Sequence, residues 1–200
     1  MARFPTPSRT RWRHLAGLLL FACAAAAAWV PQAGQAQSPA TSAAALERSV
    51  KAAFLYKFLG YAEFPATAFA DGTAPVVIGV AGSDEMAGEL TRIVAGRTVN
   101  GRPIAVRSLR EPEAAVGVHL LFLAGTDGAR VGRWLRAAPQ QPMLVVSEAP
   151  DGLPQGSVIN FNIIDERVRF DVSLDAADRW NVKLSSRLLT VAHQVRKGVN

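Results

Sequence analysis

The chain has 200 residues, half of them apolar, and its 22 Lys and Arg against 16 Asp and Glu give a net charge of +6. This length suits one globular domain and is too short for two large ones. Four arginines, at positions 3, 9, 11 and 13, precede the first acidic residue; setting them aside leaves 18 basic and 16 acidic residues, a net charge of +2. Because the remaining charges are mixed, the composition excludes the basic stripe that nucleic-acid binding requires.

Residues 1–36 have the pattern of a cleaved export signal. A basic stretch ends at His14, an apolar stretch follows over Leu15–Val30, and the small residues around Ala36 predict cleavage after it. The apolar stretch is shorter than the ~20 residues that a membrane-spanning helix needs. Cys23 is the only cysteine and stands in a weak lipobox-like sequence, so lipidation remains an alternative. The mature chain therefore has no thiol, which excludes disulfides, thiol catalysis and cysteine-ligated zinc.

The next segment predicts a short linker and an α/β domain. Residues 37–45 are small and polar, which predicts a flexible lead-in to a single domain over residues 46–200. From Leu46 the apolar spacing predicts a helix that Pro65 ends. Strands are then predicted at Val76–Ala81, Ile104–Leu109, His119–Leu123 and Met143–Ser147, with helices at Asp84–Ala95 and Asp127–Ala138. This alternation indicates a mostly parallel sheet with flanking helices.

The C-terminal third predicts a different arrangement. The segments Ser157–Ile164 and Arg167–Leu174 are expected to form an antiparallel hairpin that turns at Asp165-Glu166. A last helix is expected after Ser185 or Ser186, with an apolar side formed by Leu188, Val191 and Val195. The predicted fold is thus one α/β domain whose sheet ends in a hairpin followed by a helix.

Aromatic residues are concentrated at the first helix. Six of the eleven that follow Ala36 lie between Phe54 and Phe69. Core packing is the simplest explanation for them, but six aromatic side chains exceed what one helix face hides in a small domain. The candidates for a partner-binding surface are Tyr56, Phe58, Tyr61 and Phe64.

Polar residues of the hairpin and the last helix form a second candidate site. Asn160, Arg169, Lys183 and Arg187 offer the donors that a carboxylate or phosphate needs, so they are candidates for binding a small anionic ligand. The alternative is an ordinary polar sheet face beside a capped helix. His119 and His193, the only histidines after the leader, are each a structural histidine or a ligand contact.

Motifs of common enzyme classes are missing from the sequence. Neither GxSxG nor HExxH occurs, and Gly79–Gly82 lacks the spacing of a phosphate-binding loop. The sequence therefore predicts no catalytic residues, no metal and no cofactor.

Five sequence blocks, in order, resemble the YfiR family. They are Ser49–Phe58 with Phe64-Pro65, Gly96–Pro103, His119–Leu123, Ile159–Asn162 with Arg167–Phe170, and Lys183–Leu189. The resemblance runs from about Val50 to Val195, which is nearly the whole mature chain.

The resemblance implies a periplasmic regulator and not an enzyme. Such a protein binds the periplasmic part of a YfiN-type inner-membrane diguanylate cyclase and represses it, which lowers cyclic di-GMP and biofilm formation, and it forms homodimers. Family members often carry a cysteine where this chain has Val118, so redox sensing through disulfides is not expected here. A periplasmic module for a small anionic ligand is the alternative function, and an enzyme without a recognisable motif is the third.

Overall fold

The computed structural model describes residues 39–198. In spatial order, the strands of the main sheet are β10 (Gln194–Arg196), β8 (Arg167–Ser173), β7 (Ile159–Ile164), β6 (Leu144–Ser147), β5 (Leu120–Leu123), β2 (Val76–Ala81), β4 (Arg102–Leu109) and β3 (Thr98–Val99). Strands β7, β6, β5, β2 and β4 run parallel, whereas β8 is antiparallel to β7 and β3 is antiparallel to β4. The predicted α/β fold, with its mostly parallel sheet and C-terminal hairpin followed by a helix, is confirmed.

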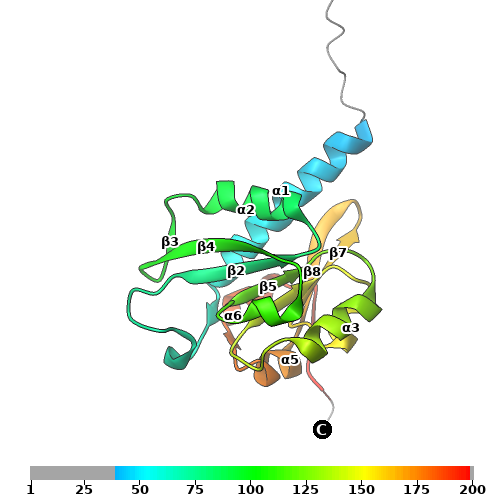
Figure 1. Ribbon diagram of the computed structural model, residues 1–200. Coiled ribbons are helices and arrows are strands. Elements are labelled where there is room, and N and C mark those ends of the chain that lie inside the picture. The colour runs from blue at the N-terminus through cyan, green and yellow to red at the C-terminus, as the bar shows by residue number, and fades with distance from the viewer. Residues whose placement is uncertain (1–38, 199–200) are drawn as a thin grey trace, which may run out of the picture. The chain divides into compact units, whose positions relative to one another are not determined.

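Helices cover both faces of this sheet (Figure 1). One face carries α1 (Pro39–Leu59) and α2 (Asp84–Val94), and the other carries α3 (Gly128–Ala137) and α4 (Gly152–Gln155). Side chains cap the starts of α2 and α3. The Ser83 hydroxyl accepts a hydrogen bond from the Met86 amide at 3.1 Å, and the Asp127 carboxylate accepts one from the Arg130 amide at 3.0 Å.

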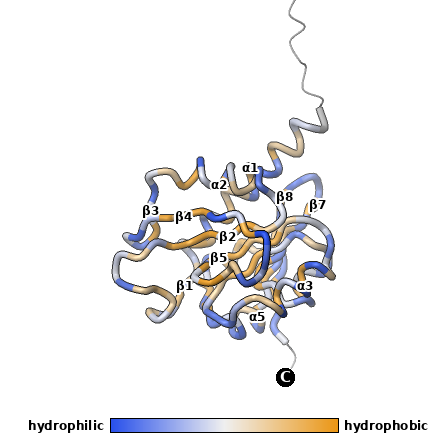
Figure 2. The backbone as a smooth tube through the Cα atoms, viewed as in Figure 1, coloured by the Kyte–Doolittle hydropathy of each residue, from blue (hydrophilic) through white to orange (hydrophobic). Residues whose placement is uncertain are grey.

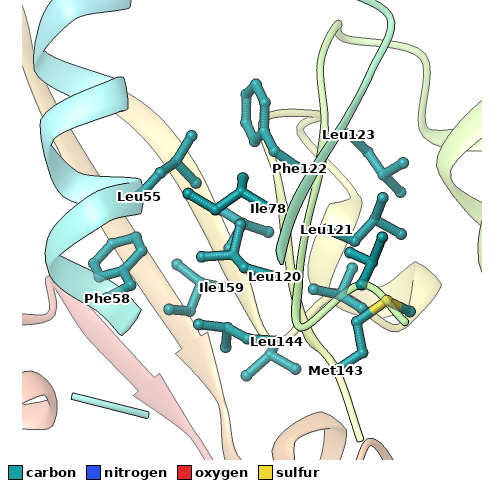
Figure 3. Packing of buried hydrophobic residues seen from close by; sticks show 14 of the residues in the cluster. Leu55, Phe58, Ile78, Leu120, Leu121, Phe122, Leu123, Met143, Leu144 and Ile159 are labelled. Atoms are coloured by element: carbon teal, nitrogen blue, oxygen red, sulfur yellow. The ribbon is translucent and has the colours of Figure 1, made fainter. Parts of the chain in front are cut away.

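The centre of the sheet is buried on both sides, as its apolar sequence requires. All four side chains of β5 are at most 1% exposed, and the strand alternates between the two helical layers. Figure 3 shows Leu55 and Phe58 of α1 directed at Ile78, Leu120 and Ile159 of the sheet. Figure 2 shows the same pattern in the hydropathy of the backbone, with apolar β2 and β5 inside and polar loops outside.

The first helix differs from the prediction at both ends. Residues 39–45 are helical, so the flexible lead-in predicted for residues 37–45 is wrong there, because an alanine-rich segment has high helix propensity. The helix ends at Leu59, before Pro65, where the Gly60 amide donates to the Lys57 carbonyl. The chain then enters β1 (Ala62–Glu63), which pairs with β9 (Lys183–Leu184) in a separate two-stranded sheet.

The last helix is also shorter than predicted. It is α6 (Ser186–Val191), capped by Ser185, and Val195 lies in β10 instead of on the helix. Of the predicted apolar side, Leu188 is buried, but Val191 is 65% exposed and Val195 is 42% exposed. The helix ends early because the chain pairs with the edge of β8 instead. The His193 amide donates to the Phe170 carbonyl at 2.8 Å, and the chain continues as the strand β10 beside β8.

The predicted export signal over residues 1–36, with Cys23, lies outside the described residues and stays a prediction. Between residues 39 and 198, no helix has the length and apolar composition to cross a membrane.

The hairpin turn between β7 and β8 generates a stability prediction. Asp165 and Glu166 both have positive φ, 49° and 57°, a conformation that L-residues other than Asn and Asp adopt at a cost. Glu166→Gly is expected to raise the free energy of unfolding by about 0.5–1 kcal/mol, because the removed strain exceeds the chain entropy that glycine adds. Urea titration measures the change, and Glu166→Ala, which keeps a β-carbon, should give no gain. A loss of stability in the glycine variant would contradict the strain argument.

Candidate functional site

The aromatic residues of α1 divide between the core and the surface. Phe58 is 1% exposed, and its ring centroid lies 5.0 Å from that of Phe170 and 5.8 Å from that of Phe161. Phe54 contacts the same two rings. Phe58 therefore belongs to the core, and its assignment to the partner-binding surface is corrected: the hairpin supplies the rings that hide it.

The other three predicted residues line the surface at the C-terminal end of α1. Tyr56 and Tyr61 border a hollow of about 400 Å³, and Phe64 borders an adjoining hollow of about 330 Å³. The two hollows share Val99 and Asn100 at the turn between β3 and β4. We call this surface the aromatic groove, defined by Tyr56, Tyr61, Phe64, Phe69, Asn100 and Arg102. Tyr61 is the most exposed of its rings, at 38%.

A buried histidine positions one wall of the aromatic groove. The His119 ring stacks on Phe69 with centroids 4.5 Å apart and meets Phe64 edge to face at 5.8 Å. Its Nδ1 accepts a hydrogen bond from the Val77 amide at 3.1 Å, and its Nε2 lies 3.0 Å from the Ala68 carbonyl. These bonds fit only the neutral ring with its proton on Nε2. Burial lowers the pKa of His119, the positive charge of Arg102 lowers it further, and the bond to Ala68 opposes them.

An arginine holds the same segment from outside. The Arg102 guanidinium lies 4.0 Å from the centroid of the Phe69 ring and donates to the carbonyls of Asp71 and Ala74 at 2.8 and 2.9 Å. The segment between β1 and β2 contains only a short 3-10 helix, Ala66–Ala68. Its position therefore depends on side chains. No local pattern in the sequence indicates that Phe69, His119 and Arg102 come together; the only signal was that His119 and Arg102 each lie in a block of the family resemblance.

The predicted anion-binding residues do not converge. Asn160 and Arg169 are diagonal neighbours on one face of the hairpin, because Asn160 pairs with Asp171 and Asn162 pairs with Arg169. Lys183 belongs to β9, opposite Glu63 of β1, and Arg187 follows on α6. The four residues thus fall on the main sheet, on the separate two-stranded sheet and on α6.

Asn160 is also occupied by its neighbours. It is 3% exposed, its Oδ1 accepts from the Ser147 hydroxyl at 2.6 Å, and its Nδ2 donates to Asn162 Oδ1 at 3.2 Å. The row continues through Asp171, which accepts from Asn162 at 2.9 Å and lies 3.0 Å from His193 Nδ1. The members of this polar row bond to one another. The backbone of α4 covers the end formed by Ser147 and Asn160, since a β-carbon on Gly152 would collide with both side chains. It is a structural network that ties β6 to β10.

A further hollow lies where parallel α/β sheets often bind ligands, outside the carboxyl ends of β2 and β5. Its central side chain is Lys51, which is 7% exposed and bound to Glu47 and, at 2.6 Å, to Glu148. Burial alone would lower the pKa of Lys51, but the bonds to and charges of Glu148 and Glu47 raise it. Because Glu148 also accepts from the Gly125 amide, these charges fasten α1 to the sheet. They leave no unpaired charge at Lys51 or Glu148 for a ligand.

Comparison with known proteins assigns the family. The sequence model described as YfiR/HmsC-like matches residues 48–193. The chain belongs to the YfiR/HmsC-like family. This is a regulatory family. The aromatic groove and the polar row both lie inside the matched segment.

The other comparisons add little. No curated protein matches this sequence. Among solved structures, a conserved domain protein from Vibrio cholerae is similar with a TM-score of 0.45 and 11% identity; the alignment covers 60% of this chain and 54% of that one. The chain thus spans about half the length of that protein.

The neutral His119 generates a pH prediction. Because its pKa in the folded chain lies below the unfolded value of 6.5, the unfolded chain binds more protons when the pH falls below about 6.5. The contribution of His119 to stability is therefore complete above that pH and is lost as the pH falls toward the folded pKa.

His119→Asn tests this assignment. Asparagine keeps an acceptor for the Val77 amide without titrating, so the variant should lose about 1–3 kcal/mol at pH 7.5 through its missing ring contacts. The difference in unfolding free energy between wild type and variant should shrink by pH 5.5, as measured by urea titration at both values. His193→Asn is the matched control. A difference that grows on acidification would contradict a neutral His119.

Proposed function

We propose that this protein represses an inner-membrane diguanylate cyclase by binding the periplasmic part of the cyclase through the aromatic groove. The family membership supports a regulator of cyclic di-GMP signalling, and the groove supplies a surface of the kind that protein partners bind. Repression would lower cyclic di-GMP and biofilm formation. The export signal over residues 1–36 would deliver the chain to the periplasm.

The observation that carries this proposal is the exposure of aromatic side chains on a rigid support. Tyr61 is 38% exposed, while α1, which ends just before it, is fixed by Phe58 in the core and by Phe54 packed against the core. Tyrosine contributes a large contact area and a polar hydroxyl at low entropic cost, which is why it is enriched at binding hot spots. Arg102 and Lys57 at the rim add charges that can select a partner.

Repression requires a difference in affinity between two states of the partner. A regulator that bound the active and inactive cyclase equally would shift nothing, however tightly it bound. A groove with rigid walls suits this task, because it fits one arrangement of the partner and not another. The bonds of His119 and Arg102 to the Ala66–Ala74 segment provide that rigidity.

A small-anion module is not retained as a second function, because Asn160 is saturated inside the fold, Lys183 lies on the separate two-stranded sheet and Arg187 lies on α6. The homodimer implied by the resemblance stays a prediction, which sedimentation at several concentrations measures.

Tyr61→Asp tests the groove. The substitution places a charge on the most exposed ring and should weaken capture of the cyclase's periplasmic part by at least about thirtyfold, which corresponds to about 2 kcal/mol. In cells lacking the gene, the wild-type copy should lower cyclic di-GMP and the variant should not.

Leu46→Asp is the matched control, because Leu46 is 67% exposed on α1, about 15 Å along the helix from Tyr56 of the groove. It should bind and repress as the wild type does. If Tyr61→Asp still binds with full affinity, the groove is not the interface; if deletion of the gene leaves cyclic di-GMP unchanged, the function itself is wrong.

The lack of cysteine after residue 36 predicts a regulator that does not respond to thiol redox state. Repression by the exported chain should therefore be the same with and without a reductant or an oxidant of thiols in the medium. Cyclic di-GMP measured in cells with a cysteine-free cyclase sensor tests this. A response to reductant in that strain would show a redox input through another component.

A further inference from the structure

Strand β4 leaves a long edge of the sheet open. It pairs with β2 over Ile104–Leu109, whereas β3 covers only Arg102 and Pro103 on its other side. Among the residues that the structure describes, no strand pairs with the outer side of residues 104–109. This edge carries no proline after Pro103, and so lacks one usual protection against strand addition.

The register shows which backbone groups face outward. Val77 and Ala81 of β2 accept hydrogen bonds from His119 and Ala124, on the side of β5, so Ile78 and Val80 direct their backbone groups at β4. In a parallel ladder, each such residue bonds to the two neighbours of its partner. Since Ile78 pairs with Val106 and Val80 with Ser108, residues 105, 107 and 109 face β2. The amides and carbonyls of Ile104, Val106 and Ser108 therefore point away from the sheet.

An apolar hollow lies beside this edge. It has a volume of about 410 Å³ and runs between β4 and the C-terminal end of α2, with Val94, Ala95, Ile104 and Val106 on its walls. Ile104 and Val106 are each partly exposed to it. A strand edge next to a helix is the arrangement that binds extended peptides, since the edge supplies hydrogen bonds and the hollow takes alternate side chains.

Five arginines lie on β4 or on the segments that flank the edge, at positions 92, 97, 102, 107 and 110. Arg92 and Arg110 are each paired with an acidic residue, Glu89 and Asp84. The other three arginines, at positions 97, 102 and 107, form no ion pair with any residue between 39 and 198. Arg97 contacts the Tyr56 ring, and the other two donate only to backbone carbonyls. A partner with carboxylates is therefore favoured.

We propose that the outer edge of β4 binds an extended acidic segment of a partner protein, which adds a strand to the sheet. Apolar side chains of that segment enter the hollow beside α2, and carboxylates on the opposite face of the added strand meet Arg107. Carboxylates at the end of the segment beside Pro103 meet Arg97 and Arg102. A second copy of this chain fits poorly, because edge-to-edge pairing would bring two sets of arginines together. The proposal does not depend on the aromatic groove binding a cyclase.

Ser108→Pro tests the edge. Proline at this position removes an outward amide and spares the ladder with β2, so the domain should stay folded, whereas Ala105→Pro removes an inward amide and should destabilise it. The probe is a short acetylated, fluorescent peptide in which valine alternates with glutamate. It should bind the wild-type domain, and Ser108→Pro should weaken binding by at least about tenfold, measured by fluorescence anisotropy.

Two peptide controls keep the test valid if Ser108→Pro does not fold. The same peptide with lysine in place of glutamate should bind at least about tenfold more weakly. N-methylation of one alternate set of its amides should abolish binding, and methylation of the other set should not, because only one set faces β4.

Three results would overturn the proposal. Equal binding of both methylated peptides would show attraction by charge alone. Absence of binding of the glutamate peptide at about 1 mM would show a closed edge. Sedimentation that finds a wild-type dimer and a Ser108→Pro monomer, with no peptide binding, would assign the edge to a second copy.

Discussion

The contact between Phe58 and the rings of Phe161 and Phe170 connects the first helix to the last hairpin, and the position of the aromatic groove at the end of that helix follows from it. Each such ring pair contributes about 0.5–1.5 kcal/mol beyond its buried area, and Phe54 doubles the contact. With Phe54 and Phe58 facing the sheet, the helical period of 3.6 directs Tyr56 to the opposite side. The core contact thus decides which aromatic rings a partner can reach.

The second constraint is local. Residues 64–75 contain one 3-10 turn and few backbone bonds of their own, so His119 and Arg102 hold them from two sides. His119 comes from the start of the buried strand β5, where solvent cannot supply a competing hydrogen bond. Its neutral form is therefore required by the fold, and the wall of the aromatic groove moves if that ring is lost. A partner surface built on a segment without regular structure is in this way made rigid by the sheet beneath it.

Local patterns predicted most of the fold, and long-range pairing limited the rest. The strands around β5 and the helices α2 and α3 were found from the sequence because hydrophobic runs and helical spacing act within a few positions. The two-residue strands β1 and β9 were not, because their pairing joins Ala62 to Leu184 across the whole chain. The same limit explains Phe58: nothing near it in the sequence indicates that Phe161 and Phe170 will bury it. It explains Asn160 too, since its partner Ser147 lies on another strand.

Arg97 links the aromatic groove to the open edge of β4. Its guanidinium lies 5.1 Å from the centre of the Tyr56 ring, and the same residue lines the hollow beside α2. A carboxylate bound at the β4 edge competes with the Tyr56 ring for the Arg97 guanidinium. An occupant of the groove that covers Tyr56 changes how available that guanidinium is to a carboxylate at the edge. Two surfaces that share a charged side chain cannot be energetically independent. Since coupling between binding sites is reciprocal, whatever one occupant does to the affinity of the other, the other does in return by the same factor.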